Sequence, residues 1–375
     1  MLDGMTETPK KSPSEPPERP DRHEGDDSAD LVRDTIAPPS HVAGSGTLDR
    51  LIETARDYAR QAASENTLKA YAKDWAHFAR WCRMRGADPL PPSPQLIGPY
   101  IADLAAPGGK APSQSASRPL SVSSIERRLS GLTWGCAQRG ERLDRKDRHI
   151  ASVLAGIRRK HARPPAQKEA ILPGDLRDML ATLPHDLRGL RDRAILLIGF
   201  AGGLRRSEIV SLDHSKDDTP DSGGWVEMLE GGVLITLRGK TGWREVEIAR
   251  GSADQTCPVY ALTQWLHYSH IDFGPIFVAV SRNGLKATID RLSDKHVARL
   301  IKQTVEDAGL HPELSKAERL RLYSGHSLRA GLASSAEVDE RYVQKQLGHA
   351  SAEMTRRYQR RRDRFRVNLT KAAGL

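Results

Sequence analysis

Six side chains in the second half of this 375-residue sequence have the types needed to break a phosphodiester bond. Such cleavage requires a nucleophile, positive charge at the phosphate and an acid for the leaving oxygen. Arginine suits the second role because it stays charged and its planar fork matches two phosphate oxygens. In chain order the candidates are Arg205, Lys240, His326, Arg329, His349 and Tyr358.

Two arginines from distant parts of the chain can clamp the non-bridging phosphate oxygens. Arg205 follows a Gly-Gly-Leu turn and leads a predicted helix through Ile209. Glu208 lies three residues on, on the same helical side, so we expect it to orient the site. His326 and Arg329 are also three residues apart, and both side chains can face one cleft. Each motif is common when it occurs singly, and the prediction rests on their combination and order.

A lysine and a tyrosine supply the remaining roles. Lys240 lies between two predicted strands, and a hairpin tip can carry its ammonium into a DNA groove as an acid for the leaving oxygen. Tyr358 lies 358 − 349 = 9 residues after His349, in an arginine-rich segment. A phenol has a pKa of about 10, so nearby cations must favour the phenolate if it is to attack.

Charge and composition predict a tail followed by a basic, folded remainder. Residues 1–46 contain seven prolines and almost no large apolar side chains, so we predict that this acidic segment is disordered. Residues 1–45 hold ten acids and five bases, or −5, whereas the whole chain carries +10. The rest therefore carries +15, the electrostatic footprint of a protein that binds nucleic acid.

Residues 47–162 are predicted to form a helical, DNA-binding domain without strands. Apolar residues recur at spacings of three and four from Leu48 onward, which is typical of amphipathic helices. The later helices are expected at Ser64–Trp81, Leu96–Leu104, Ser123–Gln138 and Lys146–Lys160. Basic side chains gather on these helices and are candidate phosphate contacts. They are Lys69, Lys73, Arg127, Arg128, Arg158, Arg159 and Lys160.

Residues 163–375 are predicted to form the domain that carries the chemistry. Adjacent prolines in His161–Lys168 mark the linker before it, because they cannot continue a helix. Three short strands with glycine-containing turns are expected at Trp225–Leu229, Val233–Leu237 and Glu245–Ile248. Helices are expected at 173–182, 188–199, 259–269, 293–308, 327–338, 340–347 and 352–365. The fold class is therefore mainly α with a small antiparallel sheet.

Several function classes find no support in the sequence. No stretch of about 18 apolar residues is present to cross a bilayer, and no secretory signal begins the chain. The three cysteines are widely spaced and form neither a disulfide framework nor a zinc pattern, which fits a reducing cytoplasm. No carboxylate cluster suggests a two-metal nuclease. The residues themselves therefore point to no metal cofactor.

The ordered motifs resemble the tyrosine recombinase (phage integrase) family over about residues 48–375. The resemblance is carried by Arg205, Lys240, the run Gly325-His326-Ser327-Leu328-Arg329, the run Leu347-Gly348-His349, and Tyr358. It implies a helical core-binding (SAM-like) domain and an α+β catalytic domain that clamp duplex DNA. It also implies that strands are exchanged by a homotetramer, with a dimer on each of two recombination sites. An accessory or partner recombinase is a further possibility.

The resemblance also implies a role for each residue. Tyr358 attacks the scissile phosphate and forms a 3′-phosphotyrosine, without metal or ATP. Arg205, Arg329 and His349 hold the phosphate, while His326 accepts the tyrosine proton and Lys240 protonates the leaving 5′ oxygen. The expected outcome is integration, excision or transposition of a mobile element by a cytoplasmic, nucleoid-associated enzyme.

Two departures from the family pattern concern regions outside these motifs. The run from Arg329 to His349 is a few residues shorter than usual, which affects the expected loop around 337–340. No folded arm-binding domain is expected before residue 48, which favours the simpler Cre or Xer architecture. The segment Val367–Leu375 is expected to dock into a neighbouring protomer.

Three alternatives remain open from the sequence. A type IB topoisomerase uses a similar Arg, Lys, His and Tyr set, although the spacing from Leu-Gly-His to the tyrosine favours a recombinase. A non-catalytic DNA-binding protein can retain the same fold. A metal site on His326 and His349 is the third alternative, and the sequence offers no further ligands at suitable spacing.

Overall fold

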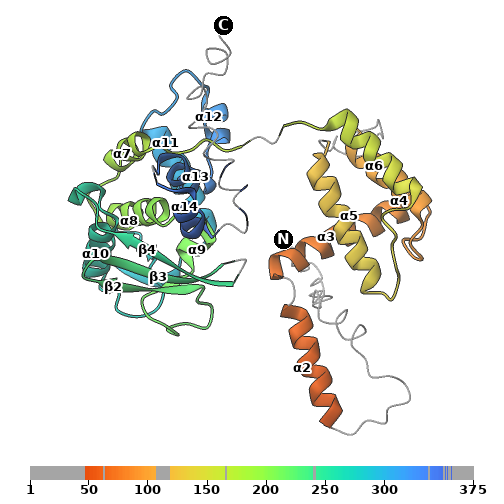
Figure 1. Ribbon diagram of the computed structural model, residues 1–375, viewed down its shortest axis with the longest axis horizontal. Helices are drawn as coiled ribbons and strands as arrows, with labels where there is room; N and C mark the ends of the chain where they lie inside the picture. Colours follow the sequence, from red (N-terminus) through yellow and green to blue (C-terminus); the bar gives the residue numbers. More distant parts are fainter. Residues whose placement is uncertain are drawn as a thin grey trace, which may run out of the picture. The chain divides into compact units, whose positions relative to one another are not determined.

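The computed structural model describes residues 47–61, 64–106, 119–164, 167–239, 242–336 and 338–348, together with Ser351, Glu353 and Arg356. The chain divides into two compact units, Met1–Pro164 and Pro165–Leu375 (Figure 1). The predicted linker His161–Lys168 spans this division. The acidic tail, the helix expected at 352–365 and the segment Val367–Leu375 lie outside the described residues, apart from Glu353 and Arg356.

The described part of the first unit contains helices joined by turns and loops, without strands. Its helices are α2 (Thr47–Gln61), α3 (Glu65–Arg83), α4 (Pro94–Ala105), α5 (Val122–Ala137) and α6 (Arg148–His161). Helices α5 and α6 begin at N-cap residues. The Ser121 and Asp147 side chains accept hydrogen bonds from the backbone N–H groups of Ser124 and His149. The predicted helices are therefore present, with ends that differ by a few residues.

An aromatic core holds the first unit together. Phe78 of α3 and Tyr100 of α4 are fully buried, with ring centroids 5.0 Å apart. Helix α5 approaches α3 closely at Gly131 and Gly135, because a Cβ at Gly135 would lie 2.4 Å from the Trp75 ring. The aromatic stripe along α3 is thus core packing, as its helical spacing indicates.

The second unit surrounds a small sheet with helices. In chain order it contains α7 (Pro173–Ala181), α8 (Leu187–Ala201), α9 (Arg206–Val210), β1 (Leu212–Asp213), β2 (Gly224–Leu229), β3 (Gly232–Gly239), β4 (Gly242–Ala249), a 3₁₀ turn (Asp254–Thr256), α10 (Pro258–Ser269), β5 (Val278–Val280), β6 (Ala287–Arg291), α11 (Asp294–Asp307), α12 (Lys316–Leu322), α13 (His326–Ser335) and α14 (Glu340–Leu347). No described helix is both long and apolar enough for a bilayer.

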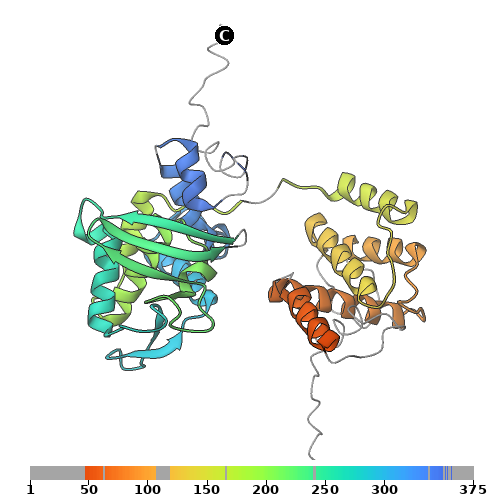
Figure 2. The same cartoon turned by 60° about the horizontal axis from the view of Figure 1, so that its bottom comes forward.

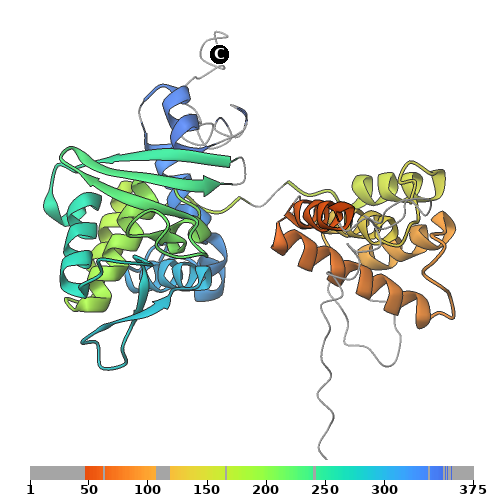
Figure 3. The same ribbon diagram turned by 90° about the horizontal axis from the view of Figure 1, so that it is seen from below.

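The main sheet has the order β1-β2-β3-β4 and packs one face on α8 and α10. Figure 2 shows the strands crossing in front of these helices, and Figure 3 shows the same layers from below. The three predicted strands are present and antiparallel, but the two-residue β1 adds a parallel pair with β2. The β5–β6 hairpin and α12 were not predicted. In β3 and β4, Gly239 pairs with Gly242, so only Lys240 and Thr241 lie between the paired residues.

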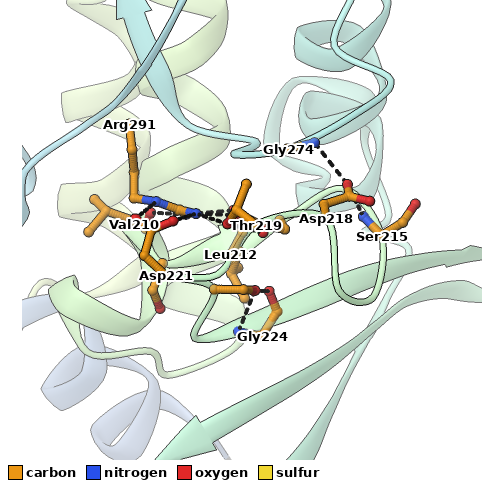
Figure 4. A network of polar contacts seen from close by, with 12 residues as sticks. Val210, Leu212, Ser215, Asp218, Thr219, Asp221, Gly224, Gly274 and Arg291 are labelled. Atoms are coloured by element: carbon orange, nitrogen blue, oxygen red, sulfur yellow. Dashed lines mark hydrogen bonds and ion pairs between the residues drawn. The ribbon is translucent and has the colours of Figure 1, made fainter.

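A network around Arg291 fixes the segment that follows α9 (Figure 4). Arg291 of β6 donates from Nη2 to the fully buried Asp213 at 2.7 Å and from Nη1 to the Val210 carbonyl at 3.0 Å. Thr219 Oγ1 donates to the other Asp213 oxygen at 2.6 Å. Because Val210 is the last residue of α9, this network holds the short helix whose first turn contains the candidate site.

Candidate active site

The backbone geometry at the start of α9 fixes Arg205. Arg205 is the N-cap residue, with extended backbone angles of φ −76° and ψ 149°. Its backbone N–H donates to Glu208 Oε2 at 2.8 Å, and its Nη1 donates to Glu208 Oε1 at 2.5 Å. One carboxylate therefore caps the helix and holds the arginine side chain. In the described part of the chain, hydrogen bonding by the Arg205 guanidinium is confined to Nη1.

Glu208 is a buried carboxylate shared by two arginines. Its residue is 6% exposed, and a second guanidinium, that of Arg244 on β4, donates from Nη2 to Oε2 at 2.9 Å. A buried carboxylate requires such partners, since its charge is costly to remove from water. Glu208 thus joins the start of α9 to the β3–β4 hairpin, and its orienting role stays a prediction.

Arg244 contacts the predicted site residue Glu208, and the motif analysis did not identify it. Its side chain is 12% exposed, and it also donates from Nη1 to the Gln346 carbonyl at 2.7 Å. Burial lowers the pKa of this guanidinium, although the neighbouring Glu208 opposes the effect. A signal was present in the sequence: Arg244 alternates with Val246 and Ile248, so it occupies an inward position on a strand.

Arg329 is buried and bound by backbone carbonyls. The residue is 1% exposed; its Nη1 donates to the Gly203 carbonyl at 2.6 Å, and its Nη2 donates to the Leu347 carbonyl. Arg329 therefore joins the Gly-Gly-Leu turn before Arg205 to the end of α14. His326, one helical turn earlier on α13, is exposed, so the two side chains of this motif occupy different environments.

The turn that carries His326 packs against α9. A Cβ at Gly325 would lie 3.0 Å from Cδ of Arg206, so the close approach favours glycine there. The Arg206 side chain continues to Asp294 of α11, with Nε and Oδ2 3.0 Å apart. The Ser324 hydroxyl accepts the His326 backbone N–H at 3.2 Å. These contacts place the first residue of α13 beside the first residues of α9.

The backbone segments leading to Lys240 and His349 both contact this cluster. Gly348 ends α14 in the left-handed conformation, with φ +58°, and a Cβ there would lie 2.7 Å from Cδ of Arg244. A Cβ at Gly239 would lie 3.7 Å from Glu208 Oε1. Lys240, His349 and Tyr358 themselves lie outside the described residues. Their predicted roles therefore rest on the sequence.

The predicted DNA-contact residues of the first unit fall into two groups. Arg127 and Arg128 lie beside Asp74, which is 3% exposed: Arg127 Nη2 donates to Oδ1 at 2.9 Å, and Arg128 Nε lies 3.7 Å from Oδ1. The other five, like Arg127, are exposed, and two of them pair with nearby acids, Lys69 with Glu65 at 2.5 Å and Arg158 with Glu126 at 2.6 Å. The remaining three exposed residues are Lys73, Arg159 and Lys160.

The arrangement concentrates guanidinium groups at the start of α9 and the end of α14. Arg205 and Arg244 share the Glu208 carboxylate, while Arg244 and Arg329 together bind three backbone carbonyls, those of Gly203, Gln346 and Leu347. Among the residues that the structure describes, no group of three or more His, Cys, Asp or Glu side chains is placed to hold a metal ion. Guanidinium groups held in place by a protein can stabilise negative charge that develops on a phosphate.

Known sequences match most of this chain. The profile of the Phage integrase family matches residues 170–364. An integrase/recombinase xerD homolog from Selenomonas ruminantium is 33% identical over 332 residues, which cover 85% of this chain and 89% of that protein. A tyrosine recombinase XerC from Xanthomonas axonopodis pv. citri (strain 306) is 28% identical over 317 residues, covering 79% and 86%.

Solved structures share the fold at lower sequence identity. The XerH site-specific recombinase bound to a palindromic difH substrate, in a post-cleavage complex, matches with a TM-score of 0.55 and 16% identity, covering 92% of this chain and 94% of that one. The Tn1549 transposon integrase in complex with transposon right end DNA matches with a TM-score of 0.51 and 15% identity, covering 81% and 92%.

Proposed function

This chain belongs to the phage integrase family of tyrosine recombinases, and we propose that its Tyr358 attacks the scissile phosphate of duplex DNA. The enzyme is a site-specific recombinase. The observation that best supports the chemistry is the cluster at Glu208. There the start of α9, the stem of the hairpin before Lys240 and the turn before His349 meet around fixed arginines.

The proposed phosphate site uses the charges of Arg205, Arg329 and His349. Within the Arg205 guanidinium, Glu208 binds only Nη1, so the remaining N–H groups suit a phosphate oxygen. Arg329 contributes a second positive charge. It binds the Gly203 carbonyl in the Gly-Gly-Leu turn that precedes Arg205. Because the transition state carries its charge on phosphate oxygens, donors held in advance lower the barrier.

The proposed reaction balances without a cofactor. Tyr358 Oη forms a bond to phosphorus, His326 accepts the phenol proton, and the bond from phosphorus to the 5′ oxygen breaks as Lys240 protonates that oxygen. The product is a 3′-phosphotyrosine and a free 5′ hydroxyl. Attack by a 5′ hydroxyl on the phosphotyrosine rejoins the strand. Since the covalent link conserves the bond energy, neither metal nor ATP is required.

The proposed partner is double-stranded DNA with two recombination sites, bound by a dimer at each site and a tetramer in total. The net charge of +15 beyond residue 45 supports this partner. We assign the phosphate contacts of the first unit to the basic residues on α3, α5 and α6. Integration, excision or transposition of a mobile element in the cytoplasm, at the nucleoid, is the proposed role.

A nicked suicide substrate tests the proposed chemistry. The purified chain is incubated with nicked duplexes from the sequences that flank its gene, in the presence of EDTA, and covalent complexes are separated on a denaturing gel. The wild type is expected to form a protein–DNA band, and Tyr358→Phe is expected to form none. Tyr342→Phe is the matched control, because Tyr342 is 70% exposed on α14. A band that survives Tyr358→Phe, or one that EDTA abolishes, would contradict the proposal.

A further inference from the structure

One guanidinium group, that of Arg244, joins three parts of the proposed site. It lies on β4, opposite Leu237 of β3 and close to the hairpin tip. From there it reaches the Glu208 carboxylate at 2.9 Å and the Gln346 carbonyl at 2.7 Å. These partners are 36 and 102 residues away in the sequence. A planar fork with several N–H donors can make both bonds at once, whereas a lysine cannot reproduce that geometry.

The bond to Gln346 places Arg244 at the end of α14. The last carbonyls of a helix have no partner within the helix and carry partial negative charge. Here two successive carbonyls are bound by arginines, Gln346 by Arg244 and Leu347 by Arg329. Gly348 then packs directly on the Arg244 side chain. The two arginines thus fix the backbone direction from which His349 follows.

The bond to Glu208 also affects Arg205. Glu208 Oε2 accepts from both the Arg205 backbone and Arg244, while Oε1 accepts from the Arg205 side chain. Since one negative charge is shared by two guanidinium groups, the pair keeps a net positive charge next to the proposed phosphate site. Arg244 therefore limits how far Glu208 neutralises Arg205.

We infer that Arg244 is a positioning residue for strand cleavage: it holds the hairpin stem and the turn before His349 at Glu208, and it leaves the group of Arg205, Glu208 and Arg244 with a net positive charge. This inference rests on the proposed function. It concerns a residue that acts through its neighbours, because its bonds reach Glu208 and Gln346 rather than a reacting group.

The test separates the rate of cleavage from DNA binding. Arg244→Met keeps the aliphatic contact with Gly348 and removes the guanidinium group. Single-turnover formation of the covalent complex on a nicked duplex, with saturating protein, is expected to slow by about 10²-fold, the scale of a small misplacement of reacting groups. Affinity for the same duplex is expected to change by less than about threefold. Arg244→Lys should recover part of the rate.

Two further variants keep the inference falsifiable. Arg250→Met removes an exposed arginine just after the last residue of β4 and should cleave like the wild type. The double variant Glu208→Gln/Arg244→Met should lose less than the sum of the two single losses, because the contact between these two side chains is removed by either change. Additive losses, a wild-type rate for Arg244→Met, or a loss confined to DNA affinity or folding would overturn the positioning role.

The same assay distinguishes this inference from the proposed function. If the wild type forms no covalent complex that depends on Tyr358, the proposed function fails and the role of Arg244 fails with it. If the wild type forms that complex and Arg244→Met forms it at the same rate, only the role of Arg244 fails.

Discussion

Both units of this chain bury a carboxylate between two arginines, and the two clusters differ in what they join. In the first unit, Asp74 of α3 binds Arg127 and Arg128, which are neighbours on α5. In the second unit, Glu208 binds Arg205 of its own helix cap and Arg244 of a strand. The first cluster ties two packed helices, whereas the second joins α9, a hairpin and, through Arg244, the end of α14.

The two clusters also differ in the exposure of one arginine each, while the second arginine is similarly buried in both, with Arg128 18% and Arg205 23% exposed. The Arg127 side chain is 47% exposed, so water can replace a lost partner, whereas the Arg244 side chain is 12% exposed. A buried charge that loses its counter-ion has no such replacement. We therefore expect the Asp74 cluster to act mainly in stability and DNA contact, and the Glu208 cluster to act in the chemistry as well.

The largest effect is expected for Glu208→Gln. This change leaves Arg205 and Arg244 without their shared counter-ion, which is expected to cost about 3–5 kcal/mol of the free energy of unfolding. It also releases the hairpin stem from α9, so single-turnover cleavage is expected to fall by about 10²-fold or more. Urea unfolding and the nicked-substrate assay measure the two quantities.

The matched control is Glu245→Gln, an exposed carboxylate next to Arg244 on the same strand. Its effect on unfolding should stay within about 0.5 kcal/mol. If Glu208→Gln cleaves at the wild-type rate, the distinction between the two clusters is lost.

A smaller, purely structural effect is expected for Asp74→Asn. The amide keeps the shape and part of the hydrogen bonding, and Arg127 remains solvated, so we expect a loss of about 1–3 kcal/mol in the free energy of unfolding. Cleavage with saturating protein should stay within about twofold of the wild type. A fall in the cleavage rate comparable to that of Glu208→Gln would show that the first unit also shapes the chemistry.

The smallest effect concerns pH and His77, which extends the Asp74 cluster. His77 Nδ1 lies 2.9 Å from the Tyr100 hydroxyl, and Arg128 Nη1 donates to that same hydroxyl at 3.3 Å. Burial, followed by the charges of Arg128 and Arg80, lowers the pKa of His77, while Asp74 and Asp103 oppose this. The unfolded chain therefore binds the proton more readily, and stability is lost as the pH falls below the ordinary histidine pKa of about 6.5.

Urea unfolding of the full chain and of His77→Gln, from about pH 8 to about pH 5, measures this contribution. The difference in unfolding free energy between the two proteins should be constant above the ordinary pKa of His77. Below that pKa, the wild type should lose stability relative to His77→Gln. A difference that does not vary with pH would contradict the account.

Regular helices and the core strands were predictable because their side chains repeat with the period of the element. The missed elements lack that repetition. In β6, Ile289 is 91% exposed, so its strand shows no apolar alternation. Helix α12 is short and mostly charged, and only its capping box of Ser315 and Glu318 marked its start.

The motif residues of the candidate site were visible in the sequence, and their connections were not. Arg205 and Glu208 are three residues apart, so a local rule predicts that they interact. The bond from Arg244 to the Gln346 carbonyl spans 102 residues and uses a backbone atom, which leaves no pattern in the side chains of α14. The sequence did place the charged Arg244 at an inward position of a strand, and this position indicates that Arg244 has a buried partner.

Identification of the amino acid bound to DNA tests the central claim most directly. The covalent complex formed by the wild type on a nicked duplex is digested with a protease and a nuclease, and the nucleotide-bearing peptide is sequenced by mass spectrometry. The account predicts a nucleotide joined through its 3′ phosphate to the hydroxyl of Tyr358. Attachment to another residue, or through a 5′ phosphate, would contradict it.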